Sequence, residues 1–143
     1  MNEKIYTAAL IIIGDEILSG RTHDKNIPYA AEALGEAGVR LMEVRVIPDD
    51  GPKIIDTVNE MRTAHDYVFT TGGIGPTHDD ITAENIGKAF GVELALNDAA
   101  YAELLAYYKD ESLITESRKK MAMIPKGAVL VDNPVSGAPG INI

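Results

Sequence analysis

The fold is decided by the stretch Thr70-Thr71-Gly72-Gly73-Ile74-Gly75-Pro76-Thr77-His78-Asp79-Asp80-Ile81-Thr82, which follows an apolar run at 67–69 and precedes a helix-like segment. This order predicts a strand, a glycine-rich turn and the start of a helix. Backbone N–H groups at a helix N-terminus bind anions, and glycines let a ligand approach the backbone closely. We therefore predict that phosphate binds against three glycines of the turn, Gly72, Gly73 and Gly75.

Two adjacent carboxylates, Asp79 and Asp80, follow these glycines. They would repel a phosphate unless a cation bridged the charges, so the stretch predicts phosphate chemistry assisted by Mg²⁺. The pattern matches neither the dinucleotide-binding fingerprint nor the P-loop, since no Gly-Lys-Ser/Thr follows the turn. An ordinary strand-to-helix turn, with Asp80 or Thr82 capping the helix, stays open as the alternative.

Outward from the turn, strand-like and helix-like segments alternate along the chain. Apolar or alternating runs predict strands at 8–13, 39–47, 67–69, 92–96 and 128–131. Helical spacing of apolar residues predicts helices at 27–34, 54–61, 83–90, 97–108 and 113–123. Strands that alternate with helices form βαβ units, so we expect a three-layer α/β/α sandwich with a mostly parallel sheet.

Acidic pairs follow the first two predicted strands as well as the third. Because parallel strands place their carboxyl ends at one edge of a sheet, all three pairs should share that edge. The pairs are Asp15 and Glu16, Asp49 and Asp50, and Asp79 and Asp80. So many carboxylates at one edge favour a cation or a function there. Asp49 is either an ordinary turn residue or a group that orients or activates a phosphate.

Composition narrows the class of protein. The chain has 143 residues, 45% apolar and 24% charged, which suits one globular domain with a sizeable core. The absence of cysteine excludes disulfides, zinc–thiolate sites and thiol catalysis. A net charge of −9 argues against nucleic acid as a partner. The apolar run at 8–13 is too short to span a membrane and has no signal-peptide cleavage pattern, so we expect a cytoplasmic protein without a membrane partner.

Several motifs together resemble the molybdopterin-binding domain family, to which MogA, MoaB and gephyrin belong. They are Gly-Asp-Glu-Ile-Leu-Ser-Gly at 14–20, Asp-Lys-Asn at 24–26, Pro-Asp-Asp at 48–50, the stretch at 70–82, and Asn-Pro with Gly-Ala-Pro-Gly at 133–140. The branch most similar is the CinA-type (competence/damage-inducible protein) N-terminal domain. An arginine of the adenylylating branch is replaced here by Asp79, which favours the CinA-type branch.

The resemblance covers essentially the whole chain and implies one domain over 1–143. Relatives continue past Ile143 into another strand and a Gly/Pro-rich loop, so we expect the domain to lack these. The resemblance also implies a homo-oligomer, a dimer or a trimer. In the adenylylating branch, Mg-ATP transfers AMP to the phosphate of molybdopterin with the help of two aspartates, and these match Asp49 and Asp80. CinA-type domains are linked to metal-dependent hydrolysis of ADP-ribose-like dinucleotides.

The resemblance implies a small phosphorylated ligand, a pterin or a nucleotide, bound with Mg²⁺ or a similar divalent cation, and a place in molybdenum cofactor biosynthesis. Molybdopterin itself is one candidate ligand. Two alternatives stay open: a metal-dependent nucleotide pyrophosphatase, and a non-catalytic binding or oligomerisation module. The catalytic residues expected are Asp49 and Asp80. The expected metal ligands are Asp79, Asp80 and Asp15. The expected ligand-binding residues are Gly14, Asp15, Glu16, Asp24, Asn26, Thr71, Gly72, Gly73, Gly75, Thr77 and Ser136.

Overall fold

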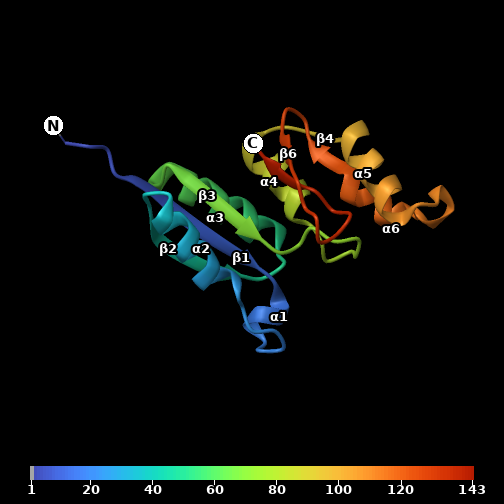
Figure 1. The fold of residues 1–143 in the computed structure, drawn as a ribbon. Helices are drawn as coiled ribbons and strands as arrows, with labels where there is room; N and C mark the ends of the chain where they lie inside the picture. The colour runs from blue at the N-terminus through green and yellow to red at the C-terminus, as the bar shows by residue number, and fades with distance from the viewer. Residues whose placement is uncertain (1) are drawn as a thin grey trace. The chain divides into compact units, whose positions relative to one another are not determined.

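The computed structural model describes residues 2–143, which form two compact units, one ending at Gly72 and the other beginning at Gly73 (Figure 1). The boundary falls inside the glycine-rich stretch, directly after the third strand. Each unit has its own strands, helices and buried side chains.

The first unit is built from parallel strands linked by helices. Its elements are β1 (Tyr6–Ile13), α1 (Asp15–Leu18), α2 (Asn26–Glu36), β2 (Val39–Ile47), α3 (Gly51–Ala64) and β3 (Tyr67–Thr71). β1 lies in the middle of the sheet, and β2 and β3 run parallel to it on either side. Each β1 residue from Ala8 to Ile13 is at most 2% exposed, as expected of a continuous apolar strand with neighbours at both edges.

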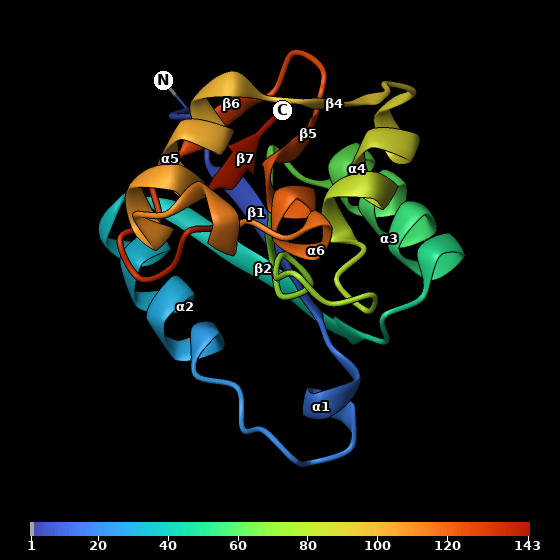
Figure 2. The same ribbon diagram turned by 90° about the vertical axis from the view of Figure 1, so that its right-hand side faces the viewer.

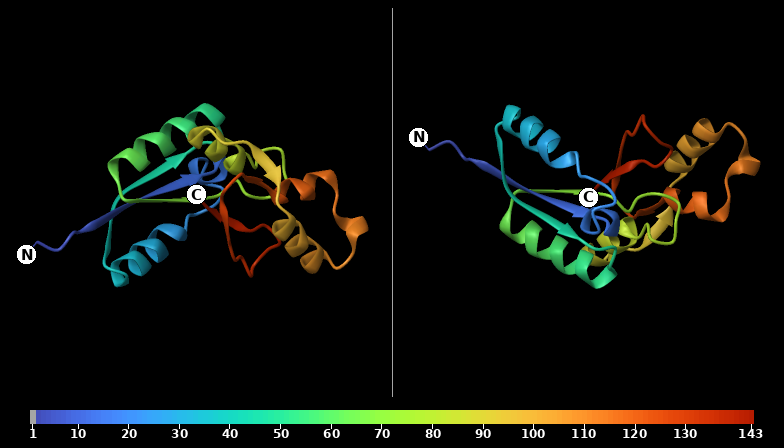
Figure 3. Two further views of the ribbon diagram at one scale, coloured as in Figure 1. Left: turned by 90° about the horizontal axis from the view of Figure 1, so that it is seen from above. Right: turned by 90° about the horizontal axis from the view of Figure 1, so that it is seen from below.

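Helices cover both faces of this sheet. Figure 3 shows α2 on one face and α3 on the other. α3 begins where the Asp50 side chain accepts a hydrogen bond from Lys53 N, and it buries Ile54, Val58 and Met61 at helical spacing. The predicted three-layer α/β/α arrangement with a parallel sheet is therefore confirmed.

The second unit contains short elements around a small core. Its elements are α4 (Thr82–Phe90), β4 (Leu94–Leu96), α5 (Asp98–Tyr108), η1 (Glu111–Leu113), α6 (Glu116–Lys119), η2 (Lys120–Ala122), β5 (Met123–Pro125), β6 (Val129–Val131) and β7 (Gly140–Asn142) (Figure 2). β4 pairs with β5 and β6 with β7, both antiparallel. The buried core consists of Ala100, Leu104, Ala122 and Ile124.

The main difference from the sequence prediction lies at 113–123, where one helix was expected. The chain instead forms η1, α6 and η2, because Ile114 has a non-helical backbone and Thr115 starts a new helix by accepting a hydrogen bond from Arg118 N. The short strand expected at 92–96 is present as β4. Among residues 2–143, no helix combines the length and apolar character needed to cross a membrane.

Candidate functional site

Two predicted site residues, Asp15 and Asp49, meet at the carboxyl ends of β1 and β2. Asp15 N donates a hydrogen bond to Asp49 Oδ2 at 3.0 Å, and Asp49 N donates one to Asp15 Oδ1 at 3.3 Å. Gly14 N donates to the Ile47 carbonyl at 3.0 Å, which ties the two strand ends together. The sequence prediction that these acidic residues share one edge of the sheet is confirmed for this pair.

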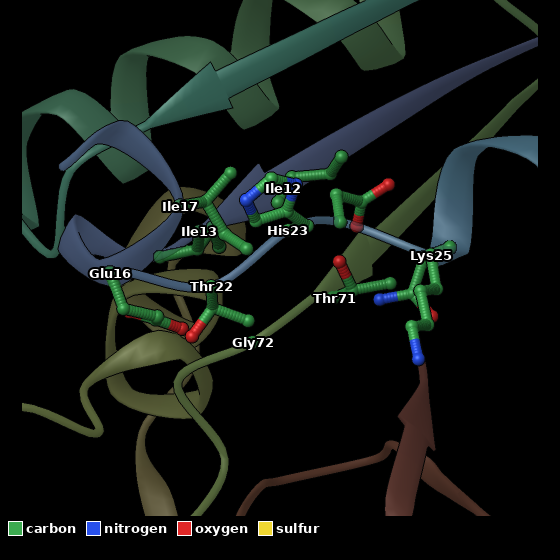
Figure 4. A pocket seen from close by; sticks show the side chains of 11 residues that line it. Ile12, Ile13, Glu16, Ile17, Thr22, His23, Lys25, Thr71 and Gly72 are labelled. Atoms are coloured by element: carbon green, nitrogen blue, oxygen red, sulfur yellow. The ribbon is translucent and has the colours of Figure 1, made fainter. Parts of the chain in front are cut away.

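Beside this edge lies a pocket of about 390 Å³ (Figure 4). It is formed by the end of β1, the helix α1, the loop that leads into α2, and the end of β3. Its lining residues are Ile12, Ile13, Glu16, Ile17, Thr22, His23, Asp24, Lys25, Asn26, Thr71 and Gly72. Three isoleucines form the apolar part of the lining, and seven of the eleven lining residues have polar or charged side chains.

Five of the predicted ligand-binding residues line this pocket: Glu16, Asp24, Asn26, Thr71 and Gly72. They come from segments up to 56 positions apart in the sequence. The predicted residue Gly14 is not part of the lining, and its backbone lies against the Glu16 side chain, since a Cβ there would be 2.6 Å from the Glu16 carboxylate.

The two carboxylate oxygens of Asp24 have different surroundings. Its Oδ2 accepts a hydrogen bond from Ile27 N at 2.8 Å in the first turn of α2, next to Lys25, which occupies the N-cap position. Its Oδ1 is buried, and within residues 2–143 it has no hydrogen-bond partner. The same is true of Thr71 Oγ1 at the end of β3. Leaving such a buried polar atom unpaired costs about 1–3 kcal/mol.

Gly72 closes the pocket at the end of the first unit. Its φ is +91°, a conformation that residues with a side chain rarely adopt. A Cβ at this position would also overlap the Ile13 carbonyl oxygen of β1. Glycine is therefore required here by backbone conformation and by space.

The rest of the glycine-rich turn belongs to the second unit and is held by Asp80. Asp80 Oδ2 accepts hydrogen bonds from both the backbone N and the Oγ1 of Thr77, each at 2.8 Å. A Cβ at Gly75 would lie 2.8 Å from the same Asp80 oxygen. Neither Asp80 nor Thr82 is the N-cap of α4; that position is taken by Ile81, without a side-chain cap bond. Asp80 thus shapes the turn rather than capping the helix.

Lys120 is a residue at this turn that the sequence analysis missed. Its Nζ donates a hydrogen bond at 2.7 Å to the carbonyl oxygen of Thr77, 43 positions away. The side chain is half-buried and brings a positive charge to a turn that carries two aspartates. No pattern in the sequence signals this contact, because it depends on where η2 packs within the second unit.

The remaining predicted residues lie elsewhere in the second unit. Asp79 pairs with His78 at 3.3 Å, with side chains 70% and 93% exposed. A Cβ at Gly73 would overlap the Thr82 hydroxyl. Ser136 Oγ accepts a hydrogen bond from Asn133 Nδ2 at 2.9 Å within the turn before β7. Across residues 2–143, no three His, Asp or Glu side chains converge to hold a metal ion.

The fold and the site define a class: a three-layer α/β domain with a pocket at the carboxyl ends of parallel strands. The chain belongs to the family described as "Probable molybdopterin binding domain", whose model matches residues 9–142. The predicted recognition of this family is confirmed.

Particular relatives place the chain among CinA-like members of this family. It is 34% identical to the crystal structure of the protein CinA with unknown function from Thermoplasma acidophilum, with a TM-score of 0.89 over 96% of this chain and 80% of that one. It is 39% identical over 134 residues to a CinA-like protein of Sulfurihydrogenibium, covering 93% of this chain and 34% of the relative. A Sulfurisphaera tokodaii protein is 41% identical over 142 residues, covering 98% of this chain and 54% of the relative.

More distant structures share the fold. The tungsten cofactor synthesizing protein MoaB from Pyrococcus furiosus has a TM-score of 0.58 at 23% identity, over 93% of this chain and 78% of that one. The chain spans about half the length of the first curated relatives that it matches.

Proposed function

We propose that this chain is a CinA-like domain that binds a small phosphorylated ligand, a pterin or a nucleotide, together with Mg²⁺. The observation that carries the proposal is the pocket at the ends of β1 and β3, which has a mixed apolar and polar lining and contains five of the predicted ligand-binding residues. In open α/β sheets, ligands bind at this edge. The heterocyclic ring of the ligand would occupy this pocket.

The donor set of the first unit fits Mg²⁺. This ion binds through one or two carboxylates and keeps several waters and substrate phosphates as its other ligands. Asp15 and Asp49 are joined by reciprocal hydrogen bonds, so two carboxylates lie side by side at the strand ends. Bound there, Mg²⁺ would supply positive charge to the phosphate groups of the ligand. In the second unit, Asp79 and Asp80 stay candidate ligands on the strength of their sequence motif.

A second candidate function is hydrolysis of an ADP-ribose-like dinucleotide, favoured by the Asp15–Asp49 pair. In this reaction water adds to phosphorus, the P–O–P bridge breaks, and AMP and ribose 5-phosphate leave with release of a proton. Asp49 would accept that proton as a general base. Adenylyl transfer to a pterin phosphate, as in molybdenum cofactor biosynthesis, would form a P–O–P bridge instead of breaking one. It would use the same two aspartates, Asp15 and Asp49. We also propose that the chain forms a homo-oligomer.

The test compares two neighbouring aspartates. Asp49→Asn keeps an oxygen that accepts the hydrogen bond from Asp15 N but loses the charge, and Asp50→Asn does the same at the N-cap of α3. We expect Asp49→Asn to weaken Mg²⁺-dependent binding of AMP by about tenfold or more, and Asp50→Asn to leave it unchanged. Isothermal titration with and without Mg²⁺ measures both. Equal binding by the two variants would refute the role of Asp49.

The reaction is tested separately with ADP-ribose and FAD as substrates. Metal-dependent release of AMP that Asp49→Asn and Asp80→Asn abolish would establish a pyrophosphatase. Binding of AMP without turnover of either dinucleotide would leave a binding domain. If neither AMP nor a pterin phosphate binds to the folded protein, the proposed function is wrong.

A further inference from the structure

Lys120 carries a positive charge that no side chain among residues 2–143 neutralises. Its Nζ donates one hydrogen bond, at 2.7 Å, to the Thr77 carbonyl oxygen, and within these residues it forms no ion pair. An ammonium group has three N–H donors, so two of them remain for another acceptor. The side chain is half-buried, and charges taken out of water are costly unless they are paired. These features indicate an anionic partner for Lys120.

The two aspartates of the glycine-rich turn are engaged elsewhere. Asp80 Oδ2 accepts hydrogen bonds from the backbone N and the Oγ1 of Thr77, each at 2.8 Å, and Asp80 N donates to the Thr77 carbonyl at 3.2 Å. Asp79 lies 3.3 Å from His78, and its side chain is 70% exposed. Asp80 therefore fixes the position of Thr77, and Thr77 in turn holds the Lys120 ammonium at the turn.

The backbone of the turn offers further donors within the same unit. Within residues 2–143, the N–H groups of Gly73, Ile74 and Gly75 donate no hydrogen bond to a protein acceptor. Successive backbone N–H groups in a turn can form a concave site for an anion. A lysine ammonium binds phosphate as a point charge, and it would complement these neutral donors.

We propose that Lys120 binds the phosphate of the ligand at the glycine-rich turn, keeping one N–H on the Thr77 carbonyl and donating the other two to phosphate oxygens. The ligand class is a phosphate monoester. Because this cation belongs to the protein, part of the affinity for the phosphate should persist when Mg²⁺ is removed. The inference rests on the proposed function, since it names the residue that holds the phosphate of the same ligand.

AMP and adenosine differ only in the phosphate, so their affinities measured in EDTA isolate its contribution. We expect the native protein to bind AMP about tenfold or more tightly than adenosine, because hydrogen bonds to charged groups are the strong ones. In Lys120→Met the ratio should fall to about one. The matched control is Lys119→Met, which removes the same charge at the neighbouring position and should keep the native ratio. Isothermal titration measures all four affinities.

Lys120→Gln separates the charge from the hydrogen bond that holds the turn. The amide NH₂ of glutamine can donate to the Thr77 carbonyl, but it carries no charge. Hydrogen exchange at the Thr77 amide, which is bonded to Asp80, reports whether the turn stays ordered. We expect Lys120→Gln to keep the native exchange and to lose the preference for AMP. Lys120→Arg keeps the charge and should retain both.

Three outcomes would overturn phosphate binding by Lys120. They are a native AMP/adenosine ratio in Lys120→Gln, loss of that ratio in Lys120→Arg while the turn stays ordered, and no preference of the native protein for AMP in EDTA. In each case, binding of AMP that depends on Mg²⁺ would leave the proposed function in place. If neither AMP nor a pterin phosphate binds with Mg²⁺, the proposed function is wrong, and this inference with it.

Discussion

Gly72→Ala is the substitution whose outcome the structure defines most sharply. Gly72 has a φ of +91°, and an added methyl group would overlap the Ile13 carbonyl oxygen. Ile13 is 1% exposed at the end of the central strand, so the carbonyl cannot move without disturbing the core. The substitution therefore imposes both an unfavourable backbone conformation and a steric clash.

These two effects can be separated. A left-handed conformation costs a residue with a Cβ about 1–2 kcal/mol. Forcing an extra carbon into a packed site costs about 1–3 kcal/mol more, so Gly72→Ala should lose about 2–5 kcal/mol of unfolding free energy. Gly20 has a φ of +78° and no atom within 4 Å of an added Cβ. Gly20→Ala should therefore lose only the conformational part, about 1–2 kcal/mol.

Urea unfolding followed by circular dichroism measures both variants, and it suits a chain without tryptophan. We expect the free energy of unfolding to be at least about 1 kcal/mol lower for Gly72→Ala than for Gly20→Ala. Equal destabilisation by the two substitutions would refute the clash with Ile13. The glycine would then be required for its conformation alone.

Two further predictions concern charged side chains. Lys120→Met should increase hydrogen exchange at the Thr77 amide, because the turn loses the hydrogen bond from Lys120 Nζ to the Thr77 carbonyl. The control variant, Lys119→Met, should leave this exchange unchanged. Equal exchange in the two variants would show that the contact does not order the turn. Arg45 binds Glu60 through two hydrogen bonds of 2.7 and 2.8 Å and holds the pKa of that carboxyl below its usual 4.5. A carboxyl whose pKa is lowered by folding stabilises the fold at pH values above its unfolded pKa, and this contribution is lost as the pH falls. Between pH 7 and pH 3, the urea midpoint of the native protein should therefore drop more than the urea midpoint of Arg45→Met. The same drop in both proteins would contradict this.

The first unit could be predicted from the sequence because its strands are long and its pattern is regular. The run from Ala8 to Ile13 is apolar throughout, as a strand with covered faces requires, and it became the central strand. The meeting of Asp15 and Asp49 followed from topology alone, since parallel strands end at the same edge.

The helices α4 and α5 of the second unit were predicted from their helical spacing, but the other elements of this unit were less predictable because they are short. β5 and β7 have three residues each, fewer than the alternation of a strand needs to be recognised. At 113–123 the apolar spacing favoured one helix, but the cap at Thr115 divides the segment. Likewise, the contact of Lys120 with Thr77 depends on packing between distant segments and leaves no local signal.

The sequence singled out candidate aspartates but did not show how each uses its oxygens. Asp24 accepts a backbone N–H with one oxygen, Asp49 accepts the N–H of Asp15, and Asp80 accepts two hydrogen bonds from Thr77. An alanine at any of these positions would remove a structural bond together with the charge, so lost binding would not reveal which of the two mattered. Asparagine keeps one acceptor oxygen in place. At Asp49 and Asp80 it removes the charge that a cation would need and replaces the other carboxylate oxygen by an NH₂ group. Loss of Mg²⁺ dependence in these two variants would therefore follow from the lost charge and not from a destabilised fold.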